Sequence, residues 1–213
     1  MTHLFFDLDG TIIDSAQGIT RAFAAVMDHF SLPYTSPDDF RCVVGPPLYE
    51  CFPRFSIPSG KEKEALRVFQ EYYARQGVYE NTLYAGVKDA LLSLKESALH
   101  LYVVTGKPEY FANMILERLG IRSLFEGVVG ADMEERVVDK EILLKEMLRR
   151  AALLPSERMA MIGDRSYDVL GGKRVGLSTV GVLWGIGTEN ELRRAGADAI
   201  LSQTSELSRL KEL

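Results

Sequence analysis

The chain has 213 residues, of which 46% are hydrophobic and 26% charged, and its formal net charge is −5. This size suits one large domain or two small ones. A mildly acidic chain without a basic stripe gains nothing from counterion release, so we expect no nucleic-acid partner. Because no apolar run approaches the length of a membrane span or of a signal-peptide core, we expect a cytoplasmic protein that does not enter membranes.

Two carboxylates stand at the end of the first predicted strand. Asp7 and Asp9 follow an apolar run and precede Gly10 and Thr11. Side chains two residues apart in an extended strand leave on the same face, so both acids are expected to point into one site. One carboxylate can attack an electrophile while its neighbour transfers protons. Taken alone, the segment also suits a surface turn or an isolated calcium loop.

A second strand that ends in carboxylates lies far downstream. The apolar run Met159–Ile162 leads into Gly163, Asp164 and Asp168. If a helix starts after Gly163, Asp164 and Asp168 lie one turn apart on one face near a helix N-terminus. Four acids packed together cannot all stay ionised without cations, so the pattern predicts a divalent metal, Mg²⁺. Helix capping by Asp164 and a solvated helix face for Asp168 are the alternatives.

Two further positions are suited to binding an anion. Thr105 follows the predicted strand 99–104, and its hydroxyl beside the amide of Gly106 is a good anion cradle. Pro108 is expected in the first turn of the next helix. Lys140 opens another helix, where the helix dipole disfavours a cation, so we expect this lysine to bind an anion. An ordinary capped turn and an exposed lysine are the alternatives.

Strands and helices alternate through most of the chain. Predicted strands cover residues 3–8, 99–104, 126–130, 158–163, 178–183 and 198–201, and predicted helices cover Val87–Glu96, Glu109–Leu119, Lys140–Leu153, Asp164–Val175 and Glu206–Leu213. This alternation predicts an α/β fold with a doubly wound parallel sheet and a Rossmann-like core. Ligands of such sheets bind outside the carboxyl ends of the strands, where the acids described above would meet.

The alternation is interrupted by an insert that is helical throughout. Residues 16–82 contain helical patterns at Gln17–Phe30, Pro37–Val44, Pro47–Arg54 and Gly60–Gln76 and no convincing strand. We therefore expect an α-helical cap domain at 16–82 and a core domain made of 1–15 and 83–213. Within the insert, Gly45 followed by Pro46 and Pro47 predicts a stiff turn, for which a plain interhelical connector is the alternative.

The motifs together resemble a known family. In order, Asp7-x-Asp9-Gly10-Thr11, Thr105, Lys140 and Gly163-Asp164-x-x-x-Asp168 resemble the four motifs of the haloacid dehalogenase-like hydrolase superfamily. Asp14-Ser15, Gly45-Pro46-Pro47-Leu48, Lys107-Pro108 and Ala195-Gly196-Ala197-Asp198 are similar to its phosphoglycolate phosphatase-like branch. The sequence departs from the pattern at Gly106, where many relatives carry Asn or Ser.

The resemblance implies a Mg²⁺-dependent phosphatase that hydrolyses small phosphate monoesters, such as phosphoglycolate-like compounds, sugar phosphates or nucleotides, through an aspartyl-phosphate. Asp7 would be the nucleophile and Asp9 the general acid and base, with Thr105 and Lys140 as the other catalytic residues. Mg²⁺ would be held by Asp7, the Asp9 main-chain carbonyl and Asp164, with Asp168 bound directly or through water. The residues implied in substrate binding are Thr11, Arg41, Gly45, Thr105, Gly106 and Lys140.

The sequence leaves several alternatives open. Lys107 competes with Lys140 for the phosphate, but the family pattern favours Lys140 and leaves Lys107 as a helix-start residue. A phosphomutase of the same superfamily and a non-enzymatic binding or regulatory protein share the motifs, whereas Asp9 argues against a dehalogenase. By resemblance the cap closes over the core site, and its Gly45 loop, flanked by Arg41, Tyr49 and Arg54, touches the leaving group. We expect a monomer or a homodimer.

Overall fold

In a computed structural model, which describes residues 1–136 and 138–211, the chain divides into two compact units. The α/β unit consists of Met1–Ile13 and Leu83–Leu213, and the helical unit of Asp14–Thr82. The two connecting segments, β2 (Ile13–Asp14) and β3 (Thr82–Leu83), pair as a two-stranded sheet. Short strands therefore mark the places where the chain passes from one unit to the other.

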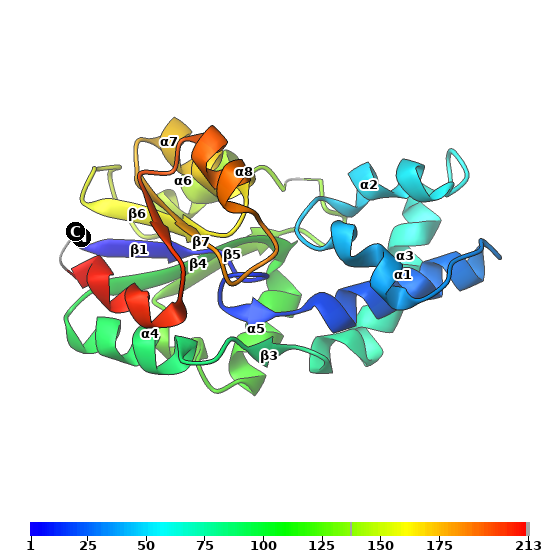
Figure 1. Cartoon of the computed structure of the whole chain (residues 1–213), viewed down its shortest axis with the longest axis horizontal. Coiled ribbons are helices and arrows are strands. Elements are labelled where there is room, and N and C mark those ends of the chain that lie inside the picture. The colour runs from blue at the N-terminus through cyan, green and yellow to red at the C-terminus, as the bar shows by residue number, and fades with distance from the viewer. Residues whose placement is uncertain (137, 212–213) are drawn as a thin grey trace. The chain divides into compact units, whose positions relative to one another are not determined.

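The α/β unit is built on a sheet of six strands in the order β5-β4-β1-β6-β7-β8 (Figure 1). The strands are β1 (His3–Phe6), β4 (His100–Pro108), β5 (Gly127–Ala131), β6 (Met159–Gly163), β7 (Ser178–Val182) and β8 (Ala199–Leu201), and each neighbouring pair is parallel. The chain runs outward from β1 through β4 to β5 and returns to β6 on the other side of β1. The topological switch point therefore lies between β1 and β6. The predicted doubly wound parallel sheet is confirmed.

Helices cover both faces of this sheet. Figure 1 shows α4 (Val87–Glu96) and α5 (Glu109–Arg118) on one side, and α6 (Lys140–Arg150), α7 (Ser166–Val175) and α8 (Glu189–Ala195) on the other. The central strand is enclosed, since Leu4 and Phe5 are 0% exposed. On the α6 side Phe5 belongs to a core cluster with Leu144 and Met147. A continuous apolar run is what a strand covered on both faces requires.

Some predicted helices differ from those in the structure. The helix predicted over Lys140–Leu153 ends at Arg150, because Ala152 has a φ of 54° that an α-helix cannot contain. The closing segment forms a 3₁₀ helix at Thr204–Lys211 rather than the predicted Glu206–Leu213, whose last two residues lie outside the described residues. Helix α8 was not predicted, since its seven residues are too short for a clear helical period.

The helical unit packs around an aromatic core. Its α-helices are α1 (Ala16–His29), α2 (Leu48–Cys51) and α3 (Glu62–Arg75), with 3₁₀ helices at Pro37–Val43, Phe52–Phe55 and Gly77–Tyr79. The ring of Phe23 on α1 lies 5.0 Å from that of Phe40 and 4.9 Å from that of Phe55. The predicted helix Pro47–Arg54 is split between α2 and a 3₁₀ turn, because Pro53 cannot donate an α-helical hydrogen bond.

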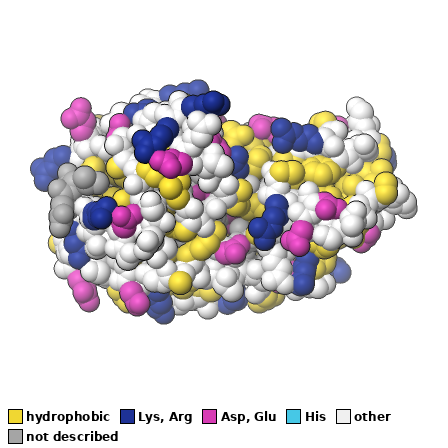
Figure 2. Space-filling view, in the orientation of Figure 1, with side chains coloured by type: hydrophobic (Ala, Val, Ile, Leu, Met, Phe, Trp, Pro, Cys, Tyr) yellow, Lys and Arg dark blue, Asp and Glu magenta, His cyan; other side chains and the backbone are white. Residues whose placement is uncertain are grey.

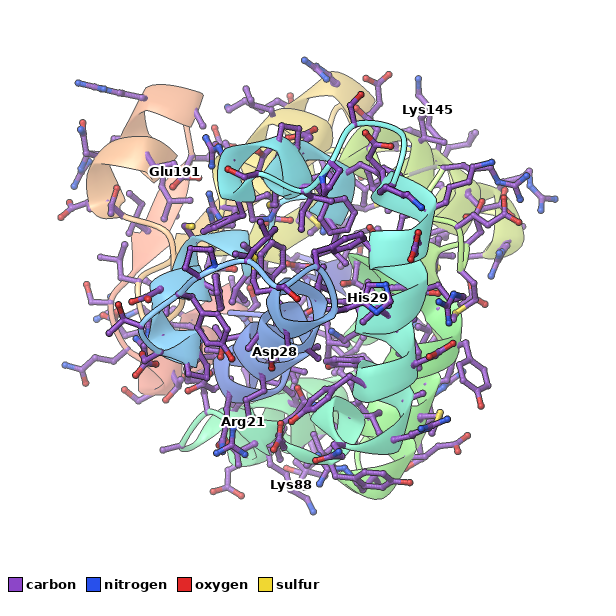
Figure 3. All side chains as sticks on the ribbon, turned by 90° about the vertical axis from the view of Figure 1, so that its right-hand side faces the viewer. Arg21, Asp28, His29, Lys88, Lys145 and Glu191 are labelled. Carbon is purple, nitrogen blue, oxygen red and sulfur yellow. The ribbon has the colours of Figure 1, made fainter. Side chains whose placement is uncertain are left out.

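Polar contacts at the surface of the helical unit connect α1 to later segments of the same unit. His29 at the end of α1 lies 2.8 Å from the carboxylate of Glu64 on α3, and Figure 3 shows His29 beside that helix. Arg21 pairs with Glu80. On the face seen in Figure 2, Lys and Arg side chains are interspersed with Asp and Glu. Among the described residues, every helix is too short or too polar to cross a membrane.

Candidate active site

Three buried carboxylates meet at the carboxyl edge of the sheet. Asp7 follows β1, and its amide donates to the Ile162 carbonyl of β6 at 2.8 Å. Asp164 follows β6, and Asp168 lies in the first turn of α7. Oxygens of these three carboxylates lie within 4.8 Å of one another, and the residues are only 9%, 0% and 2% exposed. Asp7 and Asp164 therefore stand on the two sides of the switch point, where ligands bind in this class of sheet.

Lys140 supplies the positive charge of this cluster. Its Nζ lies 2.9 Å from Asp7 Oδ1, 2.8 Å from Asp168 Oδ1 and 2.9 Å from the Val104 carbonyl oxygen. The lysine stands at the first position of α6, which the Asp139 side chain caps by accepting from the Glu141 amide. The expectation that Lys140 binds an anion agrees with these contacts, and the anions found here are two carboxylates.

The charges of the cluster do not balance. Three carboxylates and one ammonium leave two negative charges when all are ionised. Burial, offset in part by Lys140, raises the pKa of Asp7 to about 6. Burial, with Asp168 and Asp7 nearby, raises the pKa of Asp164 to about 7. Burial alone would lower the pKa of Lys140, but Asp168 and Asp7 outweigh it and raise that pKa. A divalent cation with oxygen ligands would supply the missing charge.

A loop after β7 holds Asp164 in place, and the sequence interpretation missed it. Asp164 Oδ2 accepts hydrogen bonds from the amides of Ile186 at 2.8 Å and Gly187 at 3.3 Å. A Cβ on Gly187 would lie 1.7 Å from the Asp164 carbonyl oxygen, so only glycine allows this approach. The available signal was the sequence Gly185-Ile186-Gly187, which begins three residues after the last residue of β7 (Ser178–Val182).

Thr11 also contacts Asp164. Its hydroxyl donates to Asp164 Oδ1 at 3.3 Å, and its carbonyl accepts from the Trp184 indole at 2.9 Å. The threonine is 2% exposed. In this structure Thr11 therefore supports a carboxylate of the cluster, while its predicted role in substrate binding stays a prediction.

The expectation that Asp164 and Asp168 share one helix face is wrong. Helix α7 begins at Ser166, so Asp164 precedes the helix. Asp168 Oδ2 accepts from the Arg165 amide at 3.1 Å and thereby ends the strand-to-helix turn, while its Oδ1 faces Lys140. The two acids still meet, because the turn rather than the helix brings them together.

The fourth predicted acid, Asp9, is not part of this cluster and pairs with Lys107. Lys107 Nζ lies 3.0 Å from both carboxylate oxygens of Asp9, and the two side chains are 6% and 11% exposed. Lys107 is not a helix-start residue as predicted: β4 continues to Pro108, and α5 begins only at Glu109. Of four acids expected to converge, three form the cluster and the fourth forms its own buried ion pair.

Of the remaining predicted site residues, two belong to the α/β unit and two to the helical unit. Thr105 is 1% exposed near the end of β4, where its Oγ1 accepts from the Lys107 amide at 3.2 Å. Among the described residues, a Cβ on Gly106 would meet the Val138 carbonyl oxygen at 4.0 Å, which is an ordinary contact distance. In the helical unit Gly45 has a φ of 102°, as a tight turn requires, and exposed Arg41 lies 3.5 Å from Asp38.

Comparison with known proteins identifies the family to which this fold and acidic site belong. Residues 4–182 match the family described as haloacid dehalogenase-like hydrolase. The chain therefore belongs to the haloacid dehalogenase-like hydrolases, as its motifs predicted.

The chain is also similar to three proteins with named activities. The chain is 32% identical to a 5'-nucleotidase of Pseudomonas aeruginosa, over 90% of this chain and 86% of that protein. It is 32% identical to the tyrosine-protein kinase PtkA of Mycobacterium tuberculosis, over 98% of this chain and 71% of that one. A phosphoglycolate phosphatase of Chromobacterium violaceum is 30% identical, over 95% and 92% of the two chains.

The fold is also similar to that of a solved structure. The crystal structure of a predicted phosphatase from Clostridium acetobutylicum has a TM-score of 0.94 and 33% identity, and the match covers 100% of this chain and 99% of that one. Together these similarities confirm the phosphoglycolate phosphatase-like branch and support phosphatase activity.

Proposed function

We propose that the protein is a Mg²⁺-dependent phosphatase that hydrolyses small phosphate monoesters through an aspartyl-phosphate on Asp7. The observation that carries this proposal is the buried cluster of Asp7, Asp164 and Asp168 with Lys140, at the switch point of the sheet. Phosphoryl transfer depends mainly on positioning and on stabilising charge, and the cluster provides both from rigid elements.

The protein's own residues account for two half-reactions. In the first, a carboxylate oxygen of Asp7 attacks phosphorus, the bond to the leaving oxygen breaks, and Asp9 gives that oxygen a proton. In the second, Asp9 takes a proton from water, the water oxygen attacks phosphorus, and the bond between phosphorus and Asp7 breaks. The Thr105 hydroxyl, the Gly106 amide and Lys140 would hold the phosphoryl oxygens.

The residues present fit a Mg²⁺ ion. Asp7, Asp164, Asp168 and the Asp9 main-chain carbonyl would hold it. Asp7 gives one oxygen to Lys140 and keeps the other for a metal. Asp164 accepts two backbone amides on Oδ2 and the Thr11 hydroxyl on Oδ1, and the second lone pair of Oδ1 is suited to bind a metal. Ligation by single oxygens suits Mg²⁺, whereas Ca²⁺ often takes bidentate carboxylates. When bound, Mg²⁺ would stabilise the charge on the phosphoryl oxygens as a Lewis acid.

The names of two relatives support the proposed substrate class. Proteins named 5'-nucleotidase and phosphoglycolate phosphatase support small phosphate monoesters as substrates here. We further propose that the helical unit is the predicted cap and selects the leaving group through the Gly45 loop and Arg41. The phosphate chemistry would then come from the α/β unit alone.

The proposal is tested with a chromogenic ester, p-nitrophenyl phosphate. The protein should release p-nitrophenol with Mg²⁺, lose this activity after exhaustive chelation and regain it when Mg²⁺ is returned, while Ca²⁺ should inhibit. Asp7→Asn, which keeps the size of the side chain, is the matched control and should be inactive. A fully active chelated protein would remove the metal from the mechanism. A panel of sugar phosphates, with products identified, distinguishes hydrolysis from transfer within the sugar by a phosphomutase.

A further inference from the structure

Lys107 has no role in the two proposed half-reactions, although it pairs with Asp9, the proposed acid and base. Lys107 Nζ contacts both Asp9 carboxylate oxygens at 3.0 Å, and both side chains are almost fully buried. An ammonium in contact with both oxygens makes a charge-assisted hydrogen bond that restrains the position of the carboxylate. We propose that Lys107 is a positioning residue that holds Asp9 as the proton acceptor for the water-activating half-reaction, an inference that rests on the proposed phosphatase function.

A bulge in β4 aims Lys107 at Asp9. In the pairing of β4 with β5, Val104 lies opposite Val129 and Pro108 opposite Ala131. Three residues, Thr105–Lys107, therefore stand against the single residue Gly130. Bulges bend a strand and redirect side chains, and they are common beside active sites. The hydrogen bond from the Lys107 amide to Thr105 Oγ1 closes this bulge internally.

A glycine in the neighbouring strand β5, Gly130, allows the bulge to approach closely. A Cβ on Gly130 would lie 2.4 Å from the Lys107 carbonyl oxygen and 2.7 Å from the Glu109 amide nitrogen. Both are backbone atoms, so no side chain could move aside, and glycine is required for the strands to approach here. The position of Lys107 therefore depends on Gly130 of β5.

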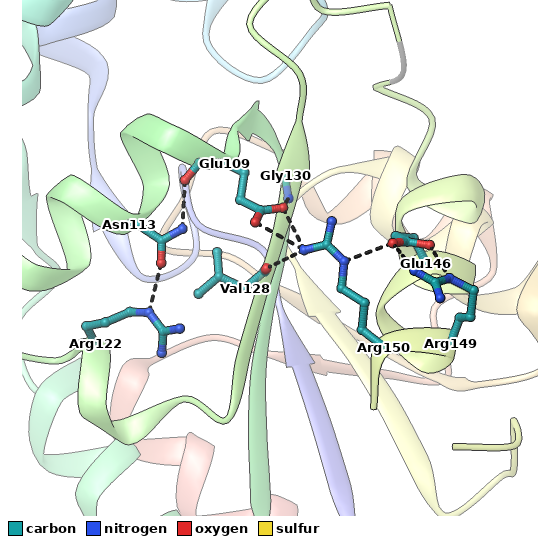
Figure 4. A network of polar contacts seen from close by, with 8 residues as sticks. All are labelled: Glu109, Asn113, Arg122, Val128, Gly130, Glu146, Arg149 and Arg150. Atoms are coloured by element: carbon teal, nitrogen blue, oxygen red, sulfur yellow. Dashed lines mark hydrogen bonds and ion pairs between the residues drawn. The ribbon is translucent and has the colours of Figure 1, made fainter. Parts of the chain in front are cut away.

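A polar network braces the outer side of the bulge. Figure 4 shows the Glu109 carboxylate, just after the bulge, with the Gly130 amide at 3.4 Å and the Arg150 guanidinium at 2.9 Å. Arg150 at the end of α6 also donates to Glu146 at 2.8 Å and to the Val128 carbonyl at 3.4 Å. These contacts tie α5, α6 and the edge strand β5 together around the bulge.

The chemistry indicates which step depends on Lys107. When the leaving group is p-nitrophenolate, the first half-reaction needs no proton from Asp9, because the anion leaves as it is. The second half-reaction always needs Asp9 to accept a proton from the attacking water. Loss of Lys107 should therefore slow the breakdown of the aspartyl-phosphate and spare its formation from a good leaving group.

The test is rapid-mixing kinetics of Lys107→Met with p-nitrophenyl phosphate and Mg²⁺. We expect a burst of p-nitrophenol of about one per active site at the rate of the unaltered protein, followed by a steady state slowed on the order of tenfold or more, which is part of the general-base contribution. Lys145→Met, at a lysine whose side chain is 61% exposed, is the control and should behave as the unaltered protein. A variant in which both phases slow equally, or neither slows, would overturn the proposal.

Gly130→Ala tests the role of the bulge by a second route. The added methyl group should displace the Lys107 backbone and give the same burst with a slowed steady state. Unaltered kinetics in a folded Gly130→Ala protein would contradict a bulge that positions Lys107.

A measurement without turnover separates this inference from the proposed function. If the unaltered protein releases no p-nitrophenol, the proposed function fails. The pair is then judged by a double-mutant cycle of Lys107→Met, Asp9→Asn and the double variant, followed by denaturant midpoints. If the shift in midpoint of the double variant is smaller than the sum of the two single shifts, Lys107 and Asp9 interact. Additive shifts would overturn this interaction.

Discussion

Replacing Lys140 by Met removes the ammonium of the cluster and keeps most of the side-chain volume. The change takes away three contacts of 2.8 to 2.9 Å, with Asp7, Asp168 and the Val104 carbonyl. Methionine can fill the space along the stem of the lysine but cannot neutralise either carboxylate. The perturbation is therefore almost purely electrostatic.

The expected loss of activity follows from two effects of this charge. At about 2.9 Å and an effective dielectric constant of about 20, an ammonium and a carboxylate attract by roughly 6 kcal/mol. Much of this attraction exists before the reaction, so only its change in the transition state alters the rate. Loss of one preorganised charge stabiliser typically costs about 3 to 4 kcal/mol, which is a hundred- to thousandfold in kcat.

Lys140 also favours the ionised form of Asp7. Burial raises the pKa of Asp7 to about 6, and Lys140 is the main influence that opposes this rise. Without Lys140 the pKa of Asp7 rises further, so a larger share of the nucleophile is protonated at neutral pH. The acid limb of kcat/KM should therefore move to higher pH in Lys140→Met, in addition to the loss that persists at alkaline pH.

The assay is kcat and kcat/KM for p-nitrophenyl phosphate across pH, with circular dichroism to verify folding. Lys107→Met is the matched comparison, since both lysines are buried and each pairs with a carboxylate at the same edge of the sheet. We expect the larger loss and the shifted acid limb in Lys140→Met. Activity within about fivefold of the unaltered protein at every pH, or a larger loss in Lys107→Met, would refute it.

Three further predictions concern the acidic cluster and the helical unit. Asp7→Asn should abolish turnover, because an amide is a poor nucleophile, and appreciable activity of this variant in steady-state assays would overturn the assignment. Mg²⁺ binding should release protons and weaken as the pH falls, because the pKa of Asp7 is raised to about 6 and that of Asp164 to about 7, and both must be ionised to bind metal. Titration calorimetry in two buffers of different ionisation enthalpy at about pH 6 measures this release, and identical heats would contradict it. In the helical unit, Gly45→Val and Arg41→Ala should change kcat/KM unequally among monoesters and leave p-nitrophenyl phosphate hydrolysis largely intact; equal losses on every ester in a folded protein would leave the loop as structure alone.

The sequence predicted the parts of the site that local patterns determine. Asp7 and Asp164 follow buried strands, and parallel strands end at one edge, so their meeting could be predicted without coordinates. Lys140 could be placed at a helix start because a capping residue, Asp139, precedes it.

The features that the sequence did not reveal depend on contacts between distant segments. Lys107 reaches Asp9 through a bulge that Gly130 of the neighbouring strand permits, and no local pattern marks a bulge. Asp164 is held by amides of Ile186 and Gly187, more than twenty residues later. Likewise, the start of α7 at Ser166 depends on which backbone amide Asp168 binds.

Mass spectrometry of Asp9→Asn after brief exposure to p-nitrophenyl phosphate and Mg²⁺ tests whether Asp7 is the nucleophile. This variant should still form the aspartyl-phosphate from p-nitrophenyl phosphate but lack the base that breaks it down. We expect one added phosphoryl group, located on the peptide that contains Asp7 and absent from the Asp7→Asn, Asp9→Asn double variant. A phosphoryl group on any other residue, or none on an Asp9→Asn protein that releases a burst of p-nitrophenol, would contradict Asp7 as the nucleophile.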